Sequence, residues 1–408
     1  MLYIAALAAC PVLAVDHTNH GKHDATTPVS TTANKGEAWQ DKLAKPSLAV
    51  TASFDESGKL WLASIRDQHI YISYSDDHGI TRSTPVKVNA EPENILGDGE
   101  NRPKIIARKG VIYVSYTQGL AQPMTGDIRF SHSTDGGQHF SSPITVNDNR
   151  EIISHRFDSM AVNDKGHVYI AWLDKRDLSA AQKAGEKYSG AAIYYAMSDN
   201  RGVNFQQNVK IADHVCECCR TAMDMDTDGY PVVMWRHIYG TNIRDHALVK
   251  LDGKMTPVRV SHENWNVAGC PHHGPSISIA SDGIYHATWF NNAPERHGLF
   301  YAYSTDQGKT FSSPLNFGKF EAQAAHPYVL GLENKIHLVW KEFDGKNTAI
   351  FGMLSIDGGK SWTIPQKRAD TQDTSDSPML VNENNRVYLS WNTQNEGYRL
   401  IEITGDDR

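Results

Sequence analysis

The residues best suited to chemistry lie in one short stretch, residues 215–220, whose sequence is VCECCR. It holds three of the five cysteines in the chain. Cys216 and Cys218 are two residues apart, so an extended backbone directs both thiols to one side, and Cys219 joins them if the chain turns. Because several thiolates together favour Cu(I), and also suit zinc, this spacing predicts a soft-metal site.

A second stretch repeats the same chemistry about fifty residues further on. Cys270 and His272 again stand two residues apart, and His273 follows directly. Thiolate combined with imidazole is a ligand set that zinc and copper both accept. We therefore expect this stretch to supply further ligands to the site formed by residues 215–220.

Disulfide bonding and thiol redox chemistry are the alternatives for these cysteines. An exported protein ordinarily pairs its cysteines, and four cysteines allow three connectivities. A bond from Cys270 to one of the three cysteines in residues 216–219 would staple two parts of the fold together. The two remaining close cysteines would then form a strained bond if they were adjacent. The sequence leaves metal binding, stapling and redox chemistry open.

A repeated pattern of short alternating runs extends through most of the chain. One residue near the end of each run forms a column that recurs about every 51–63 residues. The column consists of Ser64, Tyr116, Trp172, Trp235, Trp289, Trp340 and Trp391. Alternation of apolar and polar residues is typical of a strand with one buried face. The pattern predicts an all-β fold of repeated units, with this column in its core.

A turn motif, Ser-x-Asp-x-Gly-x-x-aromatic, follows the third strand of most units. It is complete in residues 133–140, 304–311 and 355–362, nearly complete in residues 198–205 and degenerate in residues 75–82. The Ser and Asp side chains are expected to bond backbone amides of the turn, and Gly to supply a positive φ. These residues are therefore predicted to shape the fold rather than to carry out chemistry.

This motif is the Asp-box, or BNR repeat, and from about Pro46 the chain resembles the sialidase-like β-propellers. The resemblance implies a β-propeller of four-stranded blades with Asp-box hairpins. The repeats favour seven blades, the last completed by residues 36–46, and six blades as in sialidases are the alternative. No linker divides the repeats, so residues 46–408 are predicted to form one domain.

In a propeller, the loops that lead into the innermost strands share one mouth of the central channel, where ligands commonly bind. In this chain those loops carry an unusual set of Arg, His, Cys and Asp residues. We expect the metal ligands to be Cys216, Cys218, Cys219, Cys270 and His272, with His273 and His326 in reserve. His155 and Asp376 fall on the same loops.

The resemblance also implies a second chemistry, sialidase-like hydrolysis. Sialidases hold the substrate carboxylate with three arginines, and Arg102-Pro103 resembles the Arg-x-Pro motif of that family. Arg156 and Arg220 would complete the set through bidentate carboxylate contacts. They come from consecutive blades, however, which is not the order of the family, and no Tyr–Glu nucleophilic pair stands out. Catalytic residues therefore stay unknown, and the arginines are expected to neutralise thiolates or hold an anionic ligand.

The N-terminal residues have the features of an export signal followed by a tether. Residues 1–14 include a short apolar core, and the tetrapeptide that ends at Cys10 has the pattern of a lipobox, which implies a lipid anchor. Residues 15–45 are rich in His and then in Thr and Ser, and are predicted to form a tether. We expect the protein to act in the periplasm or cell envelope.

Charge and composition exclude other classes of protein. The net charge of −7, without a sustained basic run, argues against nucleic acid as a partner. No apolar run reaches the length of a membrane-spanning helix. The sequence therefore predicts an exported sialidase-like propeller that binds copper, or zinc, for envelope copper handling. A glycoside hydrolase acting on a glycan and a disulfide-stapled scaffold for an envelope protein partner are the alternatives.

Overall fold

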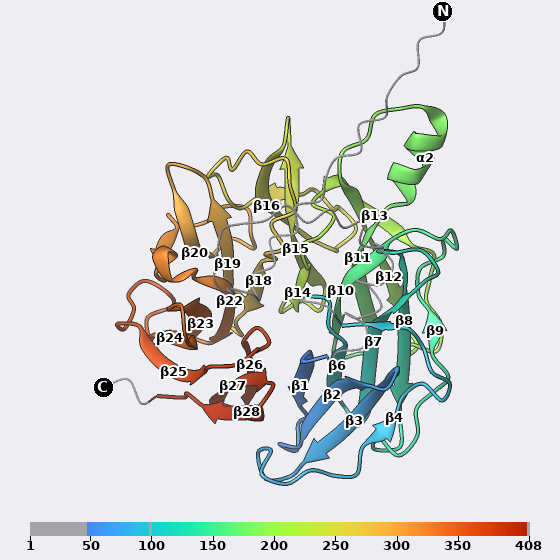
Figure 1. The fold of residues 1–408 in the computed structure, drawn as a ribbon, viewed down its shortest axis with the longest axis horizontal. Helices are drawn as coiled ribbons and strands as arrows, with labels where there is room; N and C mark the ends of the chain where they lie inside the picture. Colours follow the sequence, from blue (N-terminus) through green and yellow to red (C-terminus); the bar gives the residue numbers. More distant parts are fainter. Residues whose placement is uncertain (1–46, 98–99, 406–408) are drawn as a thin grey trace, which may run out of the picture.

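The computed structural model describes residues 47–97 and 100–405. The expected export signal and tether lie outside these residues, as does the segment expected to complete the last blade. The regular structure of the described chain is almost all antiparallel strand, and the strands form six hydrogen-bonded sheets around a common centre (Figure 1).

The first half of the described chain forms three of these sheets. The first contains β1 (Val50–Phe54), β2 (Leu60–Arg66), β3 (His69–Ser75) and β4 (Val86–Lys87). The second contains β5 (Ile95–Leu96), β6 (Lys104–Arg108), β7 (Val111–Gly119), β8 (Gly126–Ser133) and β9 (Ile144–Thr145). The third contains β10 (His155–Val162), β11 (Val168–Asp174), β12 (Ala191–Ser198), β13 (Val209–Val215), β14 (Ala222–Met225), β15 (Pro231–Tyr239), β16 (Ile243–Lys250) and β17 (Val258–Arg259).

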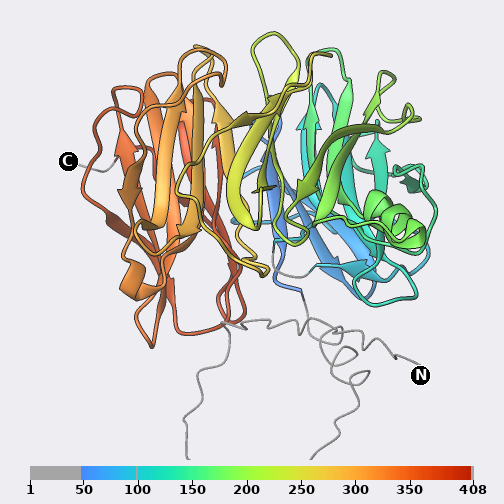
Figure 2. The ribbon, with the colours of Figure 1, turned by 90° about the horizontal axis from the view of Figure 1, so that it is seen from above.

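The second half forms the other three sheets. The fourth contains β18 (Ser276–Ile279), β19 (Tyr285–Asn292), β20 (His297–Ser304) and β21 (Leu315–Phe317). The fifth contains β22 (Ala325–Leu332), β23 (Lys335–Phe343), β24 (Thr348–Ser355) and β25 (Gln366–Thr371). The sixth contains β26 (Met379–Glu383), β27 (Arg386–Thr393) and β28 (Gly397–Glu402). Helix α2 (Arg176–Ala184) lies on the outer flank (Figure 2), and a 3-10 turn, η1 (Phe320–Ala322), precedes β22.

The expected all-β architecture of four-stranded antiparallel units is confirmed, and it is consistent with a propeller. The third sheet consists of two successive four-stranded units, β10–β13 and β14–β17, joined where Val215 of β13 pairs with His237 of β15. Because these two units share one sheet, the count of seven blades stays a prediction. In the part of the chain that the structure describes, no helix is long and apolar enough to cross a membrane.

Apolar clusters between neighbouring units hold the ring together. The predicted aromatic column is buried in them: Trp172, Trp235, Trp289 and Trp340 are fully buried. A further cluster packs residues of β1 and β2 against Val381 of β26 and Tyr388 of β27, so the first and last sheets meet. Burial of this apolar surface is the main force that closes the ring.

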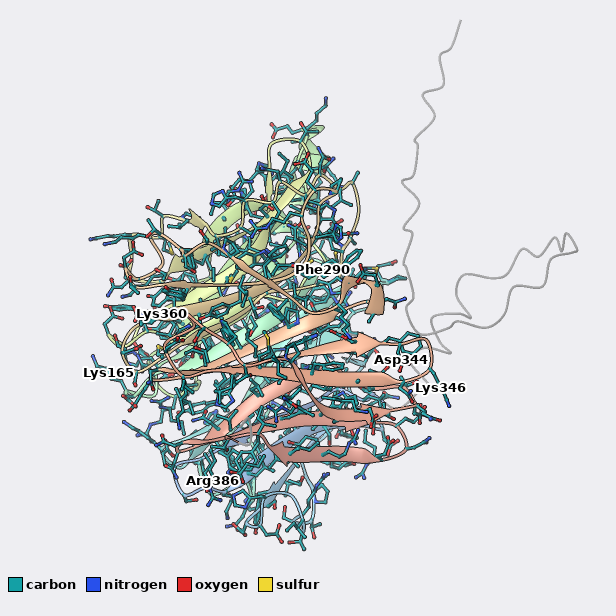
Figure 3. All side chains as sticks on the ribbon, turned by 90° about the vertical axis from the view of Figure 1, so that its left-hand side faces the viewer. Lys165, Phe290, Asp344, Lys346, Lys360 and Arg386 are labelled. Atoms are coloured by element: carbon teal, nitrogen blue, oxygen red, sulfur yellow. The ribbon has the colours of Figure 1, made fainter. Side chains whose placement is uncertain are left out.

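The Asp-box turns form as predicted. In the turn of residues 355–362, Ser355 Oγ accepts a hydrogen bond from the Gly359 amide at 2.8 Å, and Asp357 Oδ1 accepts one from the Ser361 amide at 2.9 Å. Gly359 has a φ of +88°, and a methyl group there would collide with the Tyr301 hydroxyl. Figure 3 shows Lys360 of this turn on the opposite side of the molecule from Asp344 and Lys346, which lie between β23 and β24.

The innermost strands surround the centre, and side-chain hydrogen bonds link neighbouring ones. Figure 1 shows the strands nearest the centre, namely β1, β6, β10, β14, β18, β22 and β26. Thr51 Oγ1 of β1 donates to the Pro103 carbonyl at 2.6 Å, and Asp224 Oδ2 of β14 accepts from the Ile279 amide of β18 at 2.6 Å. These contacts fix neighbouring innermost strands relative to one another.

Candidate metal centre

The loops before the innermost strands meet at one buried carboxylate, that of Glu100 before β6. Glu100 Oε1 lies 2.8 Å from Nη1 of Arg220, before β14, and 2.9 Å from Nδ1 of His326, at the start of β22. Its other oxygen accepts the amide of Gly274, before β18, at 2.6 Å. Four loops therefore converge on one point, as the repeat pattern predicts.

Glu100 is ionised in this setting, although only 6% of its surface is exposed. Burial alone would raise the pKa of the carboxyl, but the Arg220 guanidinium and the bonded His326 imidazole hold that pKa well below its usual value. Desolvation of His326 in turn lowers the pKa of its imidazole, which the bond to Glu100 only partly offsets. Separating Glu100 from Arg220 would leave a buried charge without a partner, which is costly. This ion pair therefore fixes the relative position of the two loops that carry it.

Replacing Gly274 with alanine is expected to disturb this junction. The added methyl group would overlap the Arg220 side chain and lie 2.6 Å from the Arg220 backbone oxygen. Overpacking of this kind typically destabilises a protein by about 1–3 kcal/mol. The urea midpoint should fall for Gly274→Ala but not for Gly269→Ala, a matched control whose methyl group has its nearest neighbour at 3.6 Å. Equal midpoints for the two variants would contradict the described junction.

The three cysteines of residues 215–220 form a compact, buried trio directly after β13. The chain turns at residues 217–218, which brings Cys219 to the same side as its neighbours, where an extended backbone would direct it away. Cys216 Sγ lies 3.2 Å from Cys219 Sγ and 3.7 Å from Cys218 Sγ, and all three sulfurs lie within 4.8 Å of one another. None of the three is more than 3% exposed. Hereafter we call Cys216, Cys218 and Cys219 the thiol trio.

Cys270 adjoins the cluster from the neighbouring loop. It is half-buried and packs against the thiol trio. The four cysteines that the structure describes are all free thiols, so the alternative staple between Cys270 and the trio is not formed. His272, the other ligand expected from this loop, is exposed and has a φ of +56°.

Two buried arginines stand beside the thiol trio. Arg236, which is 1% exposed, donates through Nη1 to the Arg244 carbonyl at 3.0 Å and through Nη2 to the His273 carbonyl at 3.0 Å. Its own carbonyl accepts the Cys216 amide at 2.9 Å. Arg244 Nε donates to the Val267 carbonyl at 3.0 Å. Within residues 47–97 and 100–405, neither guanidinium has a carboxylate partner, and Arg244 faces Cys216, Cys218 and Cys270 instead.

This setting favours a negative charge on the trio. Burial opposes ionisation of Cys216, but hydrogen bonds from Cys218 and Cys219 and the charges of Arg244 and Arg236 hold the pKa of its thiol well below the usual value. Hydrogen bonding to Cys216 and Cys219 raises the pKa of the Cys218 thiol. Burial raises the pKa of the Cys219 thiol. Of the three thiols, Cys216 is therefore the one whose ionisation this setting favours.

The reserve ligands His273 and His326 lie with the Glu100 junction rather than with the trio. The His273 ring stacks on Phe290 at 4.2 Å between centroids, and its centroid is 4.9 Å from that of His326. His326 Nδ1 is engaged with Glu100. The expected single set of ligands therefore divides into two adjacent groups, the thiol trio with Cys270 and the Glu100 junction.

Two of the predicted anion-binding arginines are already paired with carboxylates. Arg102 Nη2 lies 2.7 Å from Asp376 Oδ1, and both side chains are buried. Arg220 is held by Glu100. Arg156 is 3% exposed, and its guanidinium lies 4.8 Å from the centroid of the Phe157 ring. A sialidase-type role would require Arg102 and Arg220 to exchange these partners for the carboxylate of a substrate.

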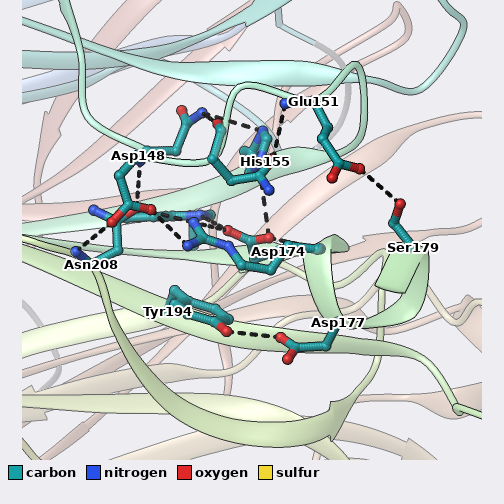
Figure 4. Close-up of polar contacts among 12 residues, drawn as sticks. Asp148, Glu151, His155, Asp174, Asp177, Ser179, Tyr194 and Asn208 are labelled. Atoms are coloured by element: carbon teal, nitrogen blue, oxygen red, sulfur yellow. Dashed lines mark hydrogen bonds and ion pairs between the residues drawn. The ribbon is translucent and has the colours of Figure 1, made fainter. Parts of the chain in front are cut away.

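His155 is turned away from the mouth, although it belongs to the same series of loops. Its Nδ1 lies 3.3 Å from Asp127 Oδ1, and its Nε2 lies 3.8 Å from Asp174 Oδ1 (Figure 4). Asp174 also holds Arg176 at the start of α2, at 2.8 Å. This network is buried between β10, β11 and the helix, so we assign His155 a structural role.

Sequence reasoning missed three residues of the site, namely Glu100, Arg236 and Arg244. Arg236 and Arg244 do carry a signal, because charged residues occupy buried positions in the strands β15 and β16. Buried charges are rare unless they are paired, so each one indicates an opposite charge nearby. Glu100 lies two residues before Arg102, in a turn, and has no comparable local signal.

Comparison with protein-family models and with curated protein sequences gives no match. Among solved structures, a PL25 polysaccharide lyase, an ulvan lyase, is similar with a TM-score of 0.53 and 9% identity, over 88% of this chain and 92% of its own. The polysaccharide lyase Uly1 is similar with a TM-score of 0.52 and 8% identity, over 88% and 89%. The Hadza microbial sialidase Hz136 has a TM-score of 0.48 and 14% identity, over 85% and 73%. At such identities the likeness concerns the fold alone.

Proposed function

We propose that this protein binds Cu(I) through Cys216, Cys218 and Cys219. The observation that carries the proposal is the buried trio of sulfurs within 4.8 Å of one another, beside two buried arginines that have no carboxylate partner among the described residues. Sulfurs that bind one ion at about 2.3 Å cannot lie more than about 4.6 Å apart, so only a small adjustment is needed. Cu(I) is among the soft metal ions that thiolates select.

Charge balance supports a monovalent ion. Metal binding requires deprotonated ligands, so the occupied trio carries three negative charges. With Cu(I) bound, the group retains two negative charges, which the two positive charges of Arg236 and Arg244 balance. A divalent zinc ion would leave one, and the pair of arginines would then be in excess. Because a buried charge is costly unless it is paired, copper fits this pocket better than zinc.

The biological role that we propose is copper handling in the cell envelope. It rests on the export signal expected in residues 1–14 and on the chemistry of the trio. A lipid anchor at Cys10 would hold the protein at a membrane surface. The His-rich segment within residues 15–45 would assist capture of the ion.

Elemental analysis tests the proposal. Protein purified without oxygen and loaded with Cu(I) should retain one copper per chain after gel filtration, and the Cys216→Ser/Cys218→Ser variant should retain none. The unloaded protein should show free thiols at Cys216, Cys218, Cys219 and Cys270. Copper retention equal in the wild type and the variant would contradict the proposal. Absence of reactive thiols in unreduced, denatured protein would favour the stapled scaffold.

Arg244 is expected to strengthen copper binding without touching the ion. Replacing it with glutamine removes one of the two charges that balance the thiolates. Groups that support metal ligands in this way typically contribute 10–100-fold to affinity, so we expect a loss of about 10–100-fold. Competition with a Cu(I) chelator measures it. Arg108→Gln, which breaks an exposed pair with Asp164, is the control and should leave the affinity unchanged.

A glycan-directed hydrolase would be recognised by a different result, the hydrolysis of a glycoside. The solved structures that share this fold include polysaccharide lyases, and the alternative ligand is therefore a glycan at the channel mouth. Because Arg102 and Arg220 are occupied by Asp376 and Glu100, we expect no release of the fluorophore from a fluorogenic sialoside. Release that is lost in Arg102→Ala would establish the hydrolase instead.

A further inference from the structure

The ligands around the thiol trio form a gradient of exposure from solvent to interior. His272 is exposed, and Cys270 is half-buried. Cys218 is 3% exposed, Cys219 1% and Cys216 fully buried. An ion bound by the trio would therefore be largely closed off from water.

Cys270 occupies the intermediate position. It packs against the trio, and the member that it adjoins is Cys218, the least buried of the three. It does not belong to the set of sulfurs that lie within 4.8 Å of one another. Cys270 can therefore contact an ion on its way to the trio without being needed for the final coordination.

Two further groups lie beside the trio. Glu217, between Cys216 and Cys218, is held by Lys175 at 2.7 Å, which ties the thiol loop to the start of α2. Arg236 is fully buried and bonds the backbone next to the trio. The loop of Cys270 and His272 is thus the side with exposed ligands.

We propose that Cys270 is the transfer ligand through which Cu(I) enters and leaves the thiol trio, with His272 as the outermost contact. The proposal rests on the function proposed above. The copper donor, or acceptor, is a partner that presents a soft ligand, a thiolate or thioether, on an accessible loop. Sulfur ligands are the class that holds Cu(I) and can exchange it with another sulfur.

The transfer consists of ligand exchanges at constant oxidation state. The bond from Cys270 sulfur to copper forms as a bond from the donor to copper breaks, and the Cys270 proton passes to solvent. The Cys218 sulfur then binds the ion, followed by Cys216 and Cys219, as the bond to Cys270 breaks. The protons of Cys218 and Cys219 leave, and Cys270 regains one. No electron is transferred, so no oxidant or reductant is required.

The test separates rate from affinity. Wild type, Cys270→Ser and Cys216→Ser are compared with bathocuproine disulfonate as the Cu(I) chelator, by equilibrium competition and by stopped-flow loading and release. Cys270→Ser should leave the equilibrium affinity unchanged but slow loading and release by the same factor, at least about tenfold. His272→Ala should slow loading to a smaller extent. Near-ultraviolet circular dichroism checks that each variant is folded.

The possible outcomes are distinct. A Cys270→Ser variant that exchanges copper at the wild-type rate overturns the transfer role and leaves the proposed function intact. One that loses affinity as strongly as Cys216→Ser makes Cys270 a permanent ligand and likewise overturns it. If the wild-type protein binds no Cu(I), the proposed function itself fails.

Discussion

Replacing Cys216 with serine should lower the affinity for Cu(I) by more than about 100-fold. Loss of a supporting group alone costs 10–100-fold, and Cys216 is a ligand in the proposed site, so its loss should cost more. Its sulfur lies 3.7 Å from the Cys218 sulfur and 3.2 Å from the Cys219 sulfur. Serine keeps the size of the side chain but offers copper a hard oxygen in place of a soft sulfur.

The measurement is competition against a chelator of known Cu(I) affinity, in the absence of oxygen. Cys216→Ala is the companion variant, because it removes the sulfur without introducing a buried hydroxyl group. Both variants should lose affinity to a similar extent. A Cys216→Ser protein that binds Cu(I) as tightly as the wild type would show that the trio is not the site.

Replacing Glu100 with glutamine should have the largest effect on stability, a loss of about 3 kcal/mol at neutral pH. Breaking a buried ion pair by removing one partner costs about 3–5 kcal/mol, because the other charge is left without compensation. Glutamine keeps the shape and one acceptor, so we expect the lower end of that range. The side chains of Glu100 and Arg220 are 4% and 16% exposed, so solvent screens the pair little.

Urea denaturation at neutral pH measures this loss. Glu151→Gln is the matched control, since its pair with Lys183 is largely exposed and should contribute little to stability. Removing both charges, in Glu100→Gln/Arg220→Met, should restore part of the stability, because no unpaired charge then remains. Equal midpoints for Glu100→Gln and Glu151→Gln would contradict the described junction.

The contribution of the Glu100–Arg220 pair to the free energy of unfolding depends on pH. The pKa of Glu100 in the folded protein lies below the ordinary value of 4.5. Its contribution to stability is therefore fully present above pH 4.5 and is lost as the pH falls through the folded pKa. The difference in unfolding free energy between wild type and Glu100→Gln should accordingly shrink below pH 4.5. A difference that grows on acidification would mean that the carboxyl is neutral in the folded state.

The parts of the fold that depend on local sequence were predictable. The turn of residues 355–362 forms because Ser355 and Asp357 accept hydrogen bonds from amides a few residues away. Its geometry therefore follows from one short motif. The buried tryptophans follow from alternation along each strand. The number of blades was not predictable to the same degree, since it depends on whether β13 and β15 pair, a contact between distant residues.

The candidate site was predictable in its location but not in its detail. Repetition alone places the loops of Arg220 and His326 side by side, and the Glu100 contacts bear this out. The local backbone conformation determines which of the predicted ligands come together. The turn at residues 217–218 brings Cys219 to the trio, whereas the backbone leaves His272 exposed. The sequence predicts both residues as metal ligands and does not distinguish them. Glu100 gained its role only from partners far along the chain.

X-ray absorption at the copper edge tests the central claim most directly. Protein loaded with one Cu(I) per chain should show three sulfur ligands in a single shell, and the Cys216→Ser variant should lose this shell while Cys270→Ser retains it. A shell dominated by nitrogen or oxygen, or a spectrum that Cys216→Ser does not change, would contradict copper binding by Cys216, Cys218 and Cys219.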